Sequence, residues 1–380
     1  MNSKNGKIIN TFIFFAAVFF LCFGLFSILN LRHDRSRSGK GDEHWFKGNL
    51  HVHTNRADGD SSPQEVINWY LDHGYDFLAI TDHDLRFTKQ GFRRKWARRI
   101  LILSGEEITI GERAEQSIHM GAVHTQYAVP ADLGKPDKKR LEYFRQQLLA
   151  QGSAPAALEA SVRGFKILSQ LKALIPEIEG QGAIAILNHP AMSLGFPLFM
   201  QLEELPPFIE LWNPHESKLY ANGQQPPDTE IMWDAALSTG KKIYAVTGDD
   251  AHHFKKTKNS PPGGVWLWIK AHKLSPEALI AALKRGDSYV STGIVLKRVE
   301  WEKSQKQIVV EVDAKPGRSY SIRFIGKEGA VLQQTDASQA VYPVKGDELY
   351  VRVKVIDNTG LKACAQPFFI SREAGSAPAQ

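Results

Sequence analysis

Cysteine is scarce in this chain of 380 residues, which contains only Cys22 and Cys364. Cys22 lies within a long apolar run near the N-terminus, so pairing with Cys364 is implausible. A disulfide framework therefore cannot be the basis of the fold, which must depend on a buried apolar core. A zinc site built from thiolates is disfavoured for the same reason, because such sites need several cysteines close together.

Signatures of several enzyme and nucleic-acid-binding classes are also missing. There is no G-x-S-x-G nucleophile motif and no convincing glycine-rich loop that would hold a phosphate. The net charge of +6 is modest, and no aromatic ladder or recognised motif supports a nucleic-acid partner, so none is expected. What the chain does have is 43% hydrophobic content, which allows a sizeable core and more than one domain.

An almost continuous apolar run occupies residues 8–31, with basic residues on both sides. A helix of this length can cross the hydrocarbon core of a bilayer. A signal peptide is the alternative, although no A-x-A-like cleavage site follows. We predict a transmembrane anchor or signal segment at residues 1–31 and a linker at residues 32–44. A single N-terminal helix would then anchor the protein in a membrane, with the catalytic domain extracytoplasmic.

Histidine and acidic residues gather where predicted strands end. His51 and His53 follow a predicted strand at residues 45–50, and on an extended backbone two residues this far apart point the same way. The other clusters are Asp82-His83-Asp84, Glu106-Glu107, Asn188-His189-Pro190 and Asp249-Asp250-Ala251-His252-His253, and His119 lies in a further predicted strand. In a (β/α) barrel the loops after the strands meet on one face. We therefore predict that these residues form one metal site.

The order of these motifs resembles a known family. Over residues 45–293 the motifs together resemble the PHP (polymerase and histidinol phosphatase) superfamily of metal-dependent phosphoesterases. They are, in order, HxH, a following Asp-Gly, T-D-H, G-x-E, H-x-x-G, N-H-P and G-x-D-A-H. Within the superfamily the chain is most similar to stand-alone hydrolases that include carbaryl-hydrolase-like relatives. The resemblance implies an α/β fold, a distorted TIM-like (β/α)7 barrel at residues 45–295, and two or three divalent metal ions.

Nine metal ligands are implied by this resemblance. The first ion would be held by His51, His53, Glu107 and Asp250; the second by Glu107, His119 and His189; the third by Asp58, His83 and His252. Glu107 is preferred to Glu106, and Asp250 to Asp249, from their places in the motifs. His119 is preferred to His124, although His119-Met-Gly121 is one residue short of H-x-x-G. Imidazoles and carboxylates suit manganese, iron or zinc.

The implied reaction is hydrolysis of a small-molecule phosphoester by a hydroxide that bridges the metal centre. Asp250 or His252 would assist proton transfer to the leaving group. Arg56, Arg86 and Lys255 lie beside the motifs and are candidates for binding a phosphate, with solvated surface roles as the alternative. Two other functions stay open: an ester, amide or carbamate hydrolase at the same metal site, and a catalytically silent, membrane-anchored binding protein. The sequence does not indicate an oligomeric state.

The pattern changes near the C-terminus. Short alternating runs separated by Gly, Asp and Asn turns predict a small all-β, sandwich-like domain at residues 296–372, followed by a disordered tail at residues 373–380. Within the barrel domain, residues 136–180 are predicted to be a helical insertion. Glu210 and Asn213, at the end of a predicted strand, are candidates for supporting the ligands or contacting substrate.

Overall fold

The computed structural model describes residues 43–88, 99–111, 117–214, 228–255 and 260–370. The described residues from Trp45 onward belong to one compact unit. The protein is mixed α/β, as predicted, and its strands form three sheets.

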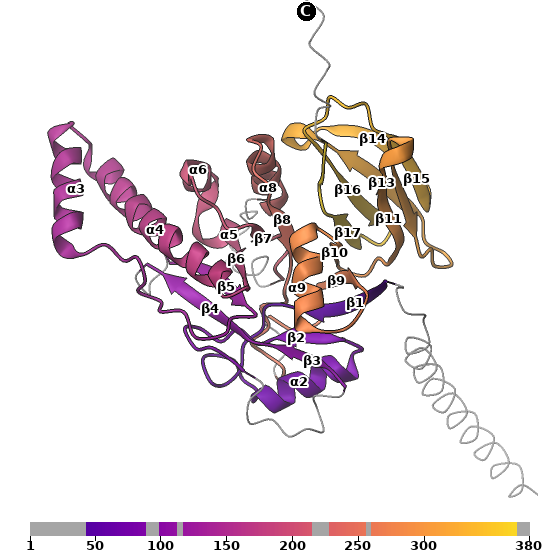
Figure 1. Cartoon of the computed structure of the whole chain (residues 1–380), viewed down its shortest axis with the longest axis horizontal. Coiled ribbons are helices and arrows are strands. Elements are labelled where there is room, and N and C mark those ends of the chain that lie inside the picture. Colours follow the sequence, from indigo (N-terminus) through magenta and orange to yellow (C-terminus); the bar gives the residue numbers. More distant parts are fainter. Residues whose placement is uncertain (1–42, 89–98, 112–116, 215–227, 256–259, 371–380) are drawn as a thin grey trace, which may run out of the picture. The chain divides into compact units, whose positions relative to one another are not determined.

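The largest sheet has ten strands and joins segments from both ends of the described chain (Figure 1). Its order is β14-β13-β16-β17-β10-β9-β1-β2-β3, and β18 pairs with β16. These strands are β1 (His44–Asn49), β2 (Phe77–Ala79), β3 (Leu101–Leu103), β9 (Trp266–Ala271), β10 (Ser288–Ser291), β13 (Tyr320–Ile325), β14 (Val331–Thr335), β16 (Tyr350–Asp357), β17 (Lys362–Ala365) and β18 (Phe368–Phe369). β1, β2 and β3 are parallel, whereas β9, β10, β17, β16 and β13 pair antiparallel in turn.

The second sheet has the order β4-β5-β6-β7-β8. Its strands are β4 (Gly105–Ile110), β5 (Ile118–Val123), β6 (Ile184–Asn188), β7 (Phe208–Glu210) and β8 (Tyr244–Val246). β5 is antiparallel to both neighbours, while β6, β7 and β8 are parallel. The sequence predicts β5, β6, β7 and β8 of this sheet but not β4, because Glu106 and Glu107 are expected after a strand and instead lie within β4.

The predicted distorted (β/α)7 barrel is not found as a closed barrel among the described residues, where β1–β3 and β4–β8 belong to separate sheets. The reason lies in the connections. A parallel repeat needs a crossover of a dozen or so residues between strands, but only Ser104 separates β3 from β4. β4 and β5 then pair antiparallel, which breaks the alternation of strand and helix that a regular barrel requires.

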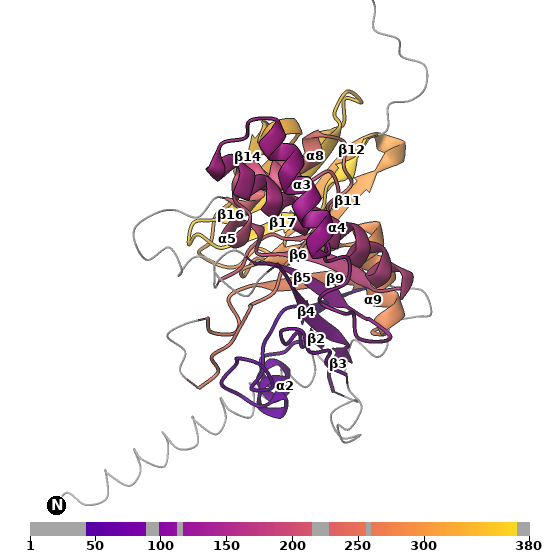
Figure 2. The same ribbon diagram turned by 90° about the vertical axis from the view of Figure 1, so that its left-hand side faces the viewer.

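The helices pack against these sheets. They are α2 (Pro63–Asp72), α3 (Lys138–Ala150), α4 (Pro155–Gly180), α5 (Pro190–Ser193), α6 (Gly195–Gln201), α8 (Thr229–Ser238) and α9 (Pro276–Arg285). α2 begins with a capping box, in which Ser62 and Glu65 satisfy each other's backbone N–H groups. α4 runs alongside β5 and β6 (Figure 2), and Leu171, Leu174 and Ile178 of α4 belong to the same apolar core as those strands.

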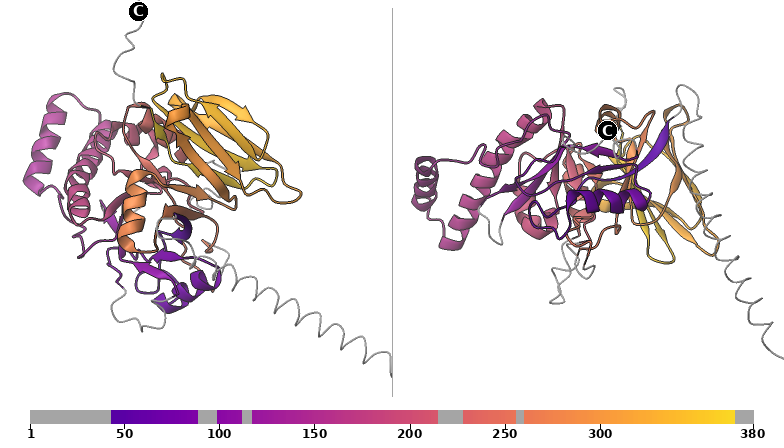
Figure 3. Two further views of the ribbon diagram at one scale, coloured as in Figure 1. Left: turned by 45° about the vertical axis from the view of Figure 1, so that its right-hand side comes forward. Right: turned by 90° about the horizontal axis from the view of Figure 1, so that it is seen from below.

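Helix α3 lies beside α4 (Figures 1 and 3), and the rings of Phe144 and Phe165 stack between them with centroids 4.3 Å apart. Both helices fall in the predicted helical insertion at residues 136–180. Much of this insertion lies outside the apolar core, since α3 has no buried residue and α4 buries mainly its C-terminal half.

No helix in the described ranges is both long and apolar enough to cross a bilayer. α4 has 26 residues but carries charged side chains along its length. Three segments lie outside the described residues: the predicted anchor at residues 1–31, residues 32–42 of the predicted linker, and the tail from residue 371. The prediction of a membrane-anchored protein with an extracytoplasmic catalytic domain is therefore corrected: the structure gives it no support.

The third sheet, β11 (Leu296–Glu302), β12 (Gln307–Val312) and β15 (Gln339–Pro343), lies in the C-terminal part of the chain. Figure 3 shows the strands of the C-terminal part gathered together. Alternate residues of the third sheet, such as Ile308 and Val310, share an apolar core with Phe324 and Val353 of the ten-stranded sheet. β17 pairs with β10 of that sheet, so the C-terminal strands continue the sheet that carries β1 and β2.

A buried arginine ties these C-terminal strands to α8. The guanidinium of Arg352 on β16 donates to both carboxylate oxygens of Asp234, at 2.7 and 2.6 Å, and lies 3.4 Å from Glu230. Lys354 also pairs with Glu230, at 2.5 Å. Only 2% of the Arg352 side chain is exposed, so the pair is almost fully removed from water and each charge depends on the other.

Candidate metal centre

The structure brings together all nine side chains that the sequence predicts to be metal ligands. They arrive on β1, β2, β4, β5, β6 and β8 or on the loops that follow these strands. Backbone bridges join Val52 to Ala251 and His83 to Glu107, which holds the separate segments side by side. Four overlapping groups have donor atoms within 4.8 Å of one another, and together they contain His51, His53, Asp58, His83, Glu107, His119, His189, Asp250 and His252.

The group predicted to hold the first ion comprises His51, His53, Glu107 and Asp250. The Nε2 atoms of His51 and His53 lie 3.1 Å apart. His53 Nε2 is 3.1 Å from Glu107 Oε2 and 3.2 Å from Asp250 Oδ1, and His51 Nε2 is 3.2 and 3.4 Å from oxygens of the same two carboxylates. Two ligands each about 2.1 Å from one ion would be roughly 3.0 Å apart in octahedral and 3.4 Å apart in tetrahedral coordination. The observed spacings therefore suit a single ion.

The second group shares Glu107 with the first. Glu107 Oε1 lies 3.1 Å from His189 Nε2 and 3.4 Å from His119 Nδ1, and these two nitrogens are 3.3 Å apart. Asn188 Nδ2 donates to the same oxygen at 2.8 Å. The Asn188 amide lies over Gly121, where a Cβ would be 2.8 Å from Asn188 Oδ1. This contact explains why position 121, two residues after His119 on β5, is a glycine.

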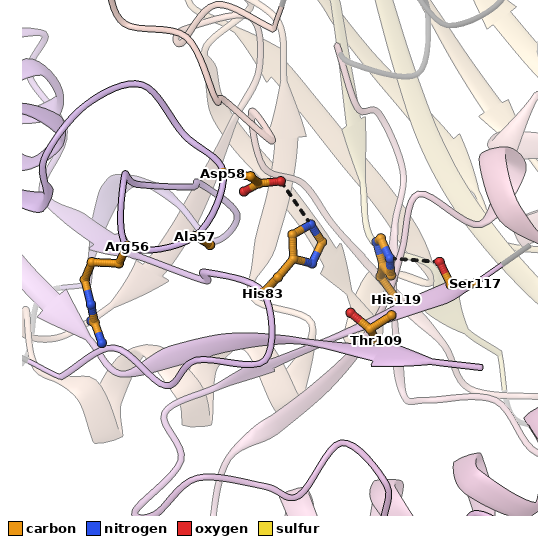
Figure 4. A pocket seen from close by; sticks show the side chains of 7 residues that line it. All are labelled: Arg56, Ala57, Asp58, His83, Thr109, Ser117 and His119. Carbon is orange, nitrogen blue, oxygen red and sulfur yellow. Dashed lines mark hydrogen bonds and ion pairs between the residues drawn. The ribbon is translucent and has the colours of Figure 1, made fainter. Parts of the chain in front are cut away.

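The third group surrounds Asp58, whose side chain is half exposed. Asp58 oxygens lie 3.3 Å from His53 Nδ1, 3.5 Å from His83 Nε2 and 3.3 Å from His252 Nε2. His53 and His83 thus each present one ring nitrogen to Asp58 and the other to Glu107. Figure 4 shows Asp58 facing His83 beside a pocket, with His119 farther along.

Several buried polar atoms at this site have no hydrogen-bond partner among the described residues. They are Glu107 Oε2, His53 Nδ1, His83 Nδ1 and His189 Nδ1. Buried polar atoms without partners are costly and uncommon in folded proteins. Nitrogen and oxygen donors with no thiolate among them suit manganese, iron or zinc. The residues present therefore fit divalent metal ions.

The electrostatics of the cluster favour added positive charge. Burial opposes the charged imidazolium of His51 and His53, but Glu107 and Asp250 outweigh burial and hold the pKa of both histidines well above its usual value. The same balance raises the pKa of His189 to about 9. The carboxylates respond in the opposite sense, and their histidine neighbours hold the pKa of Glu107 and Asp250 well below normal despite burial. A metal ion would replace these protons.

Two of the candidate ligands have unusual backbone conformations. His189 has φ 26° and Asp250 has φ 48°, in the left-handed region that non-glycine residues rarely adopt. Such conformations cost about 1–3 kcal/mol each and cluster at functional sites. Beside Asp250 the chain passes very close to His51, because a Cβ on Gly248 would lie 2.2 Å from the His51 Cβ. Only glycine allows β8 to end so near this histidine.

A pocket of about 560 Å³ opens beside the second and third ligand groups. It is lined by Arg56, Ala57, Asp58, His83, Thr109, Ser117 and His119 (Figure 4). Ser117 Oγ lies 3.3 Å from His119 Nε2, the ring nitrogen that faces away from Glu107. Sequence reasoning missed Thr109 and Ser117, because a hydroxyl in an isolated strand pattern carries no signal of its own.

The three basic residues predicted to bind phosphate lie in different surroundings. Arg56 lines the pocket, but its guanidinium lies over the Phe87 ring, 5.4 Å from the centroid, and points away from His83 in Figure 4. Arg86 donates to the hydroxyl and backbone oxygen of Thr125. Lys255 forms an exposed ion pair with Glu65 at 3.2 Å. Their role as substrate contacts stays a prediction.

Asp249, which the sequence set aside in favour of Asp250, holds a loop in place. It is fully buried and accepts hydrogen bonds from the backbone N–H groups of Gly263, Gly264 and Val265, and from the Tyr70 hydroxyl at 2.7 Å. No local pattern in the sequence marks Tyr70 as a partner of Asp249. The position of its hydroxyl depends on tertiary packing.

Glu106 points away from the metal site, because side chains alternate along β4. It is 1% exposed, accepts a hydrogen bond from the Val129 N–H at 2.9 Å, and has its pKa raised by burial to about 7.

This raised pKa predicts a pH-dependent stability. The folded pKa is above the ordinary value of 4.5, so the stability contributed by protonated Glu106 is lost as pH rises from about 4.5 through about 7. Between pH 5 and pH 8 we expect the wild type to lose about 1–2 kcal/mol more than Glu106→Gln. Urea unfolding of metal-free protein at both pH values measures this, and equal losses would contradict it.

No protein-family model and no curated protein matches this chain. Among solved structures it is similar to a two-domain protein from Bacteroides vulgatus that contains a predicted PHP-like metal-dependent phosphoesterase, with 14% identity, 87% of this chain and 97% of the other covered, and a TM-score of 0.42. It is also similar to an amidohydrolase from Chromobacterium violaceum (20% identity, 55% and 88% covered, TM-score 0.34). A third structure is a protein from Bifidobacterium adolescentis assigned as a metal-dependent phosphoesterase (18% identity, 55% of this chain and 88% of the other covered, TM-score 0.33).

These likenesses are distant, and none of the three is described as a carbaryl hydrolase. The carbaryl-hydrolase-like subgroup stays a prediction. The function proposed below depends on the geometry of the ligand groups and not on these neighbours.

Proposed function

We propose that the protein is a metal-dependent hydrolase and that its substrates are small phosphoesters. One observation carries the proposal: the Glu107 carboxylate lies within 3.4 Å of five imidazoles, those of His51, His53, His83, His119 and His189. One buried carboxylate shared by several imidazole groups is the arrangement that a multinuclear centre needs, because a bridging carboxylate can serve two ions at once.

Two or three divalent ions would be held by the nine residues, with Glu107 shared between the first and second groups. Such ions lower the pKa of a bound water toward neutrality and stabilise charge on a phosphoryl oxygen. Manganese, iron and zinc all suit these donors.

Asp250 and His252 are the proposed catalytic residues. Asp250 turns Oδ1 toward His51 and His53, while Asn213 Nδ2 donates to its Oδ2 at 3.1 Å. His252 Nδ1 lies 2.9 Å from the backbone oxygen of Asp250, so its proton resides on Nδ1 and Nε2 faces Asp58. That Nε2 atom would either hold an ion or accept a proton from the nucleophilic water and then pass it to the leaving group.

The pocket chemistry supports an anionic substrate. Thr109 and Ser117 offer hydroxyls, and Arg56 offers a guanidinium that can turn from the Phe87 ring toward a phosphate. The volume of about 560 Å³ is much larger than a phosphate group, so part of the alcohol side of the substrate also fits.

The test combines metal analysis with turnover. The full chain is loaded with manganese, iron or zinc, bound metal is measured by mass spectrometry, and hydrolysis of p-nitrophenyl phosphate, bis-p-nitrophenyl phosphate and p-nitrophenyl acetate is compared. Two or three ions per chain with phosphoester turnover is the expected result. Turnover of the carboxyl ester alone would replace the phosphoesterase proposal with an ester hydrolase, and a chain that binds no metal would refute both.

A further inference from the structure

Glu210, at the end of β7, contacts two of the candidate ligands and reaches a third through Asn213. Its Oε1 lies 3.0 Å from His51 Nδ1, and its Oε2 accepts the backbone N–H of His189 at 2.9 Å. The Asn213 amide donates to Glu210 Oε2 at 3.0 Å and to Asp250 Oδ2 at 3.1 Å. Only 2% of Glu210 is exposed. One buried carboxylate therefore touches residues from both the first and the second ligand groups.

The contact with His51 decides which ring nitrogen of that histidine can bind a metal ion. An ionised carboxylate only accepts hydrogen bonds, so the proton must lie on His51 Nδ1. The lone pair is then on Nε2, which is the atom that faces His53, Glu107 and Asp250. The geometry thus leaves His51 ready to bind through the nitrogen that points into the cluster.

The contact with His189 acts on the backbone. His189 is held at φ 26°, a conformation that needs support from its surroundings. Glu210 Oε2 accepts the N–H of this strained residue, and the His189 imidazole faces Glu107 on β4. Among the described residues Glu210 forms no ion pair with a lysine or arginine, and the ring that faces it is that of His51.

We infer that Glu210 is a positioning residue that sets the tautomer of His51 and fixes His189, so that the first and second metal sites form together. The inference rests on the proposed function, because it assumes that these histidines bind metal. It assigns to Glu210 no contact with the substrate.

Glu210→Gln is a sharp test because the substituted side chain has the same size. If the amide oxygen faces His51, the NH₂ group meets two other donors, the His189 N–H and the Asn213 NH₂. If the NH₂ group faces His51 instead, it donates to Nδ1 and the proton moves to Nε2, which can then no longer bind an ion. Neither orientation satisfies all the contacts that the carboxylate makes.

The experiment uses the full chain as wild type, Glu210→Gln and the matched control Glu106→Gln, a buried carboxylate on the opposite face of β4 from Glu107. Zinc affinity is measured by competition with a chelator, and the zinc content by mass spectrometry. We expect affinity to fall about 10- to 100-fold in Glu210→Gln and to change less than about twofold in the control. ¹⁵N NMR of the zinc-loaded wild type should show His51 protonated at Nδ1, which requires no variant.

The outcomes distinguish a failure of the proposed function from a failure of the inference about Glu210. A wild type that binds none of zinc, manganese and iron refutes the proposed function and this inference with it. If the wild type binds zinc, two results would overturn the inference alone: Glu210→Gln binds zinc equally well, or His51 carries its proton on Nε2. The NMR result decides the inference even if Glu210→Gln does not fold.

Discussion

Glu107→Gln should abolish most of the catalytic activity and displace metal from more than one position. The side chain keeps its size, but it loses its charge and one of the two acceptor oxygens that face five imidazoles. Because the residue is shared by two ligand groups, we expect at least one ion per chain to be lost. Turnover should fall by about 10³-fold or more, which corresponds to about 4 kcal/mol of transition-state stabilisation.

Glu106→Gln is the matched control for this change, since it makes the same substitution at the neighbouring residue. Glu106 accepts a hydrogen bond from Val129 on the opposite face of β4, away from the candidate ligands. We expect its metal content and turnover to equal those of the wild type at pH 6. Equal loss in both variants would mean that disruption of β4, and not loss of a ligand, explains the effect of Glu107→Gln.

Arg352→Met should destabilise the fold by about 3–5 kcal/mol. The substitution leaves the Asp234 carboxylate buried without its bidentate partner and removes one of two cations near Glu230. Burial would then oppose both negative charges, and the tie between α8 and β16 would be lost. Urea unfolding of wild type and variant at neutral pH measures the difference in the free energy of unfolding.

Two further variants show whether the unpaired buried charge is responsible for the loss of stability in Arg352→Met. Arg323→Met removes an arginine from the adjacent strand β13, where its Nε donates to Gln334 at 3.0 Å on the surface, so the free energy of unfolding should change by less than about 0.5 kcal/mol. Adding Asp234→Leu to Arg352→Met should recover part of the lost stability, because an apolar pair leaves no uncompensated carboxylate. A double variant no more stable than the single one would contradict this account.

Much of the candidate site could be predicted from the sequence because its information is local. The alternation of side chains on an extended strand places His51 and His53 on the same side and Glu106 and Glu107 on opposite sides. The punctuation of α2 by Ser62, Pro63 and Glu65 is equally local. Most motifs could therefore be assigned to the end of a strand, although Glu107 lies within β4, and the structure does place the nine predicted residues within one cluster.

Other features depend on contacts between segments far apart in the chain. Nothing near Ser104 reveals that β3 and β4 belong to different sheets, and this separation is why the described strands do not form the predicted distorted (β/α)7 barrel. The Tyr70 hydroxyl reaches Asp249 across 179 residues of sequence. The predicted membrane anchor also depended on an apolar run alone, and the described structure contains no membrane-spanning helix to support it.

The sequence by itself determined which residue types can bind metal here and at which strand ends they lie, because strand periodicity and motif spacing act over a few residues. Only the tertiary structure decided how these residues meet. Sheet pairing places Glu107 among five imidazoles and sets Glu210 against His51, 159 residues earlier in the chain. Such distances follow from how the sheets and the apolar core pack, which no local pattern encodes.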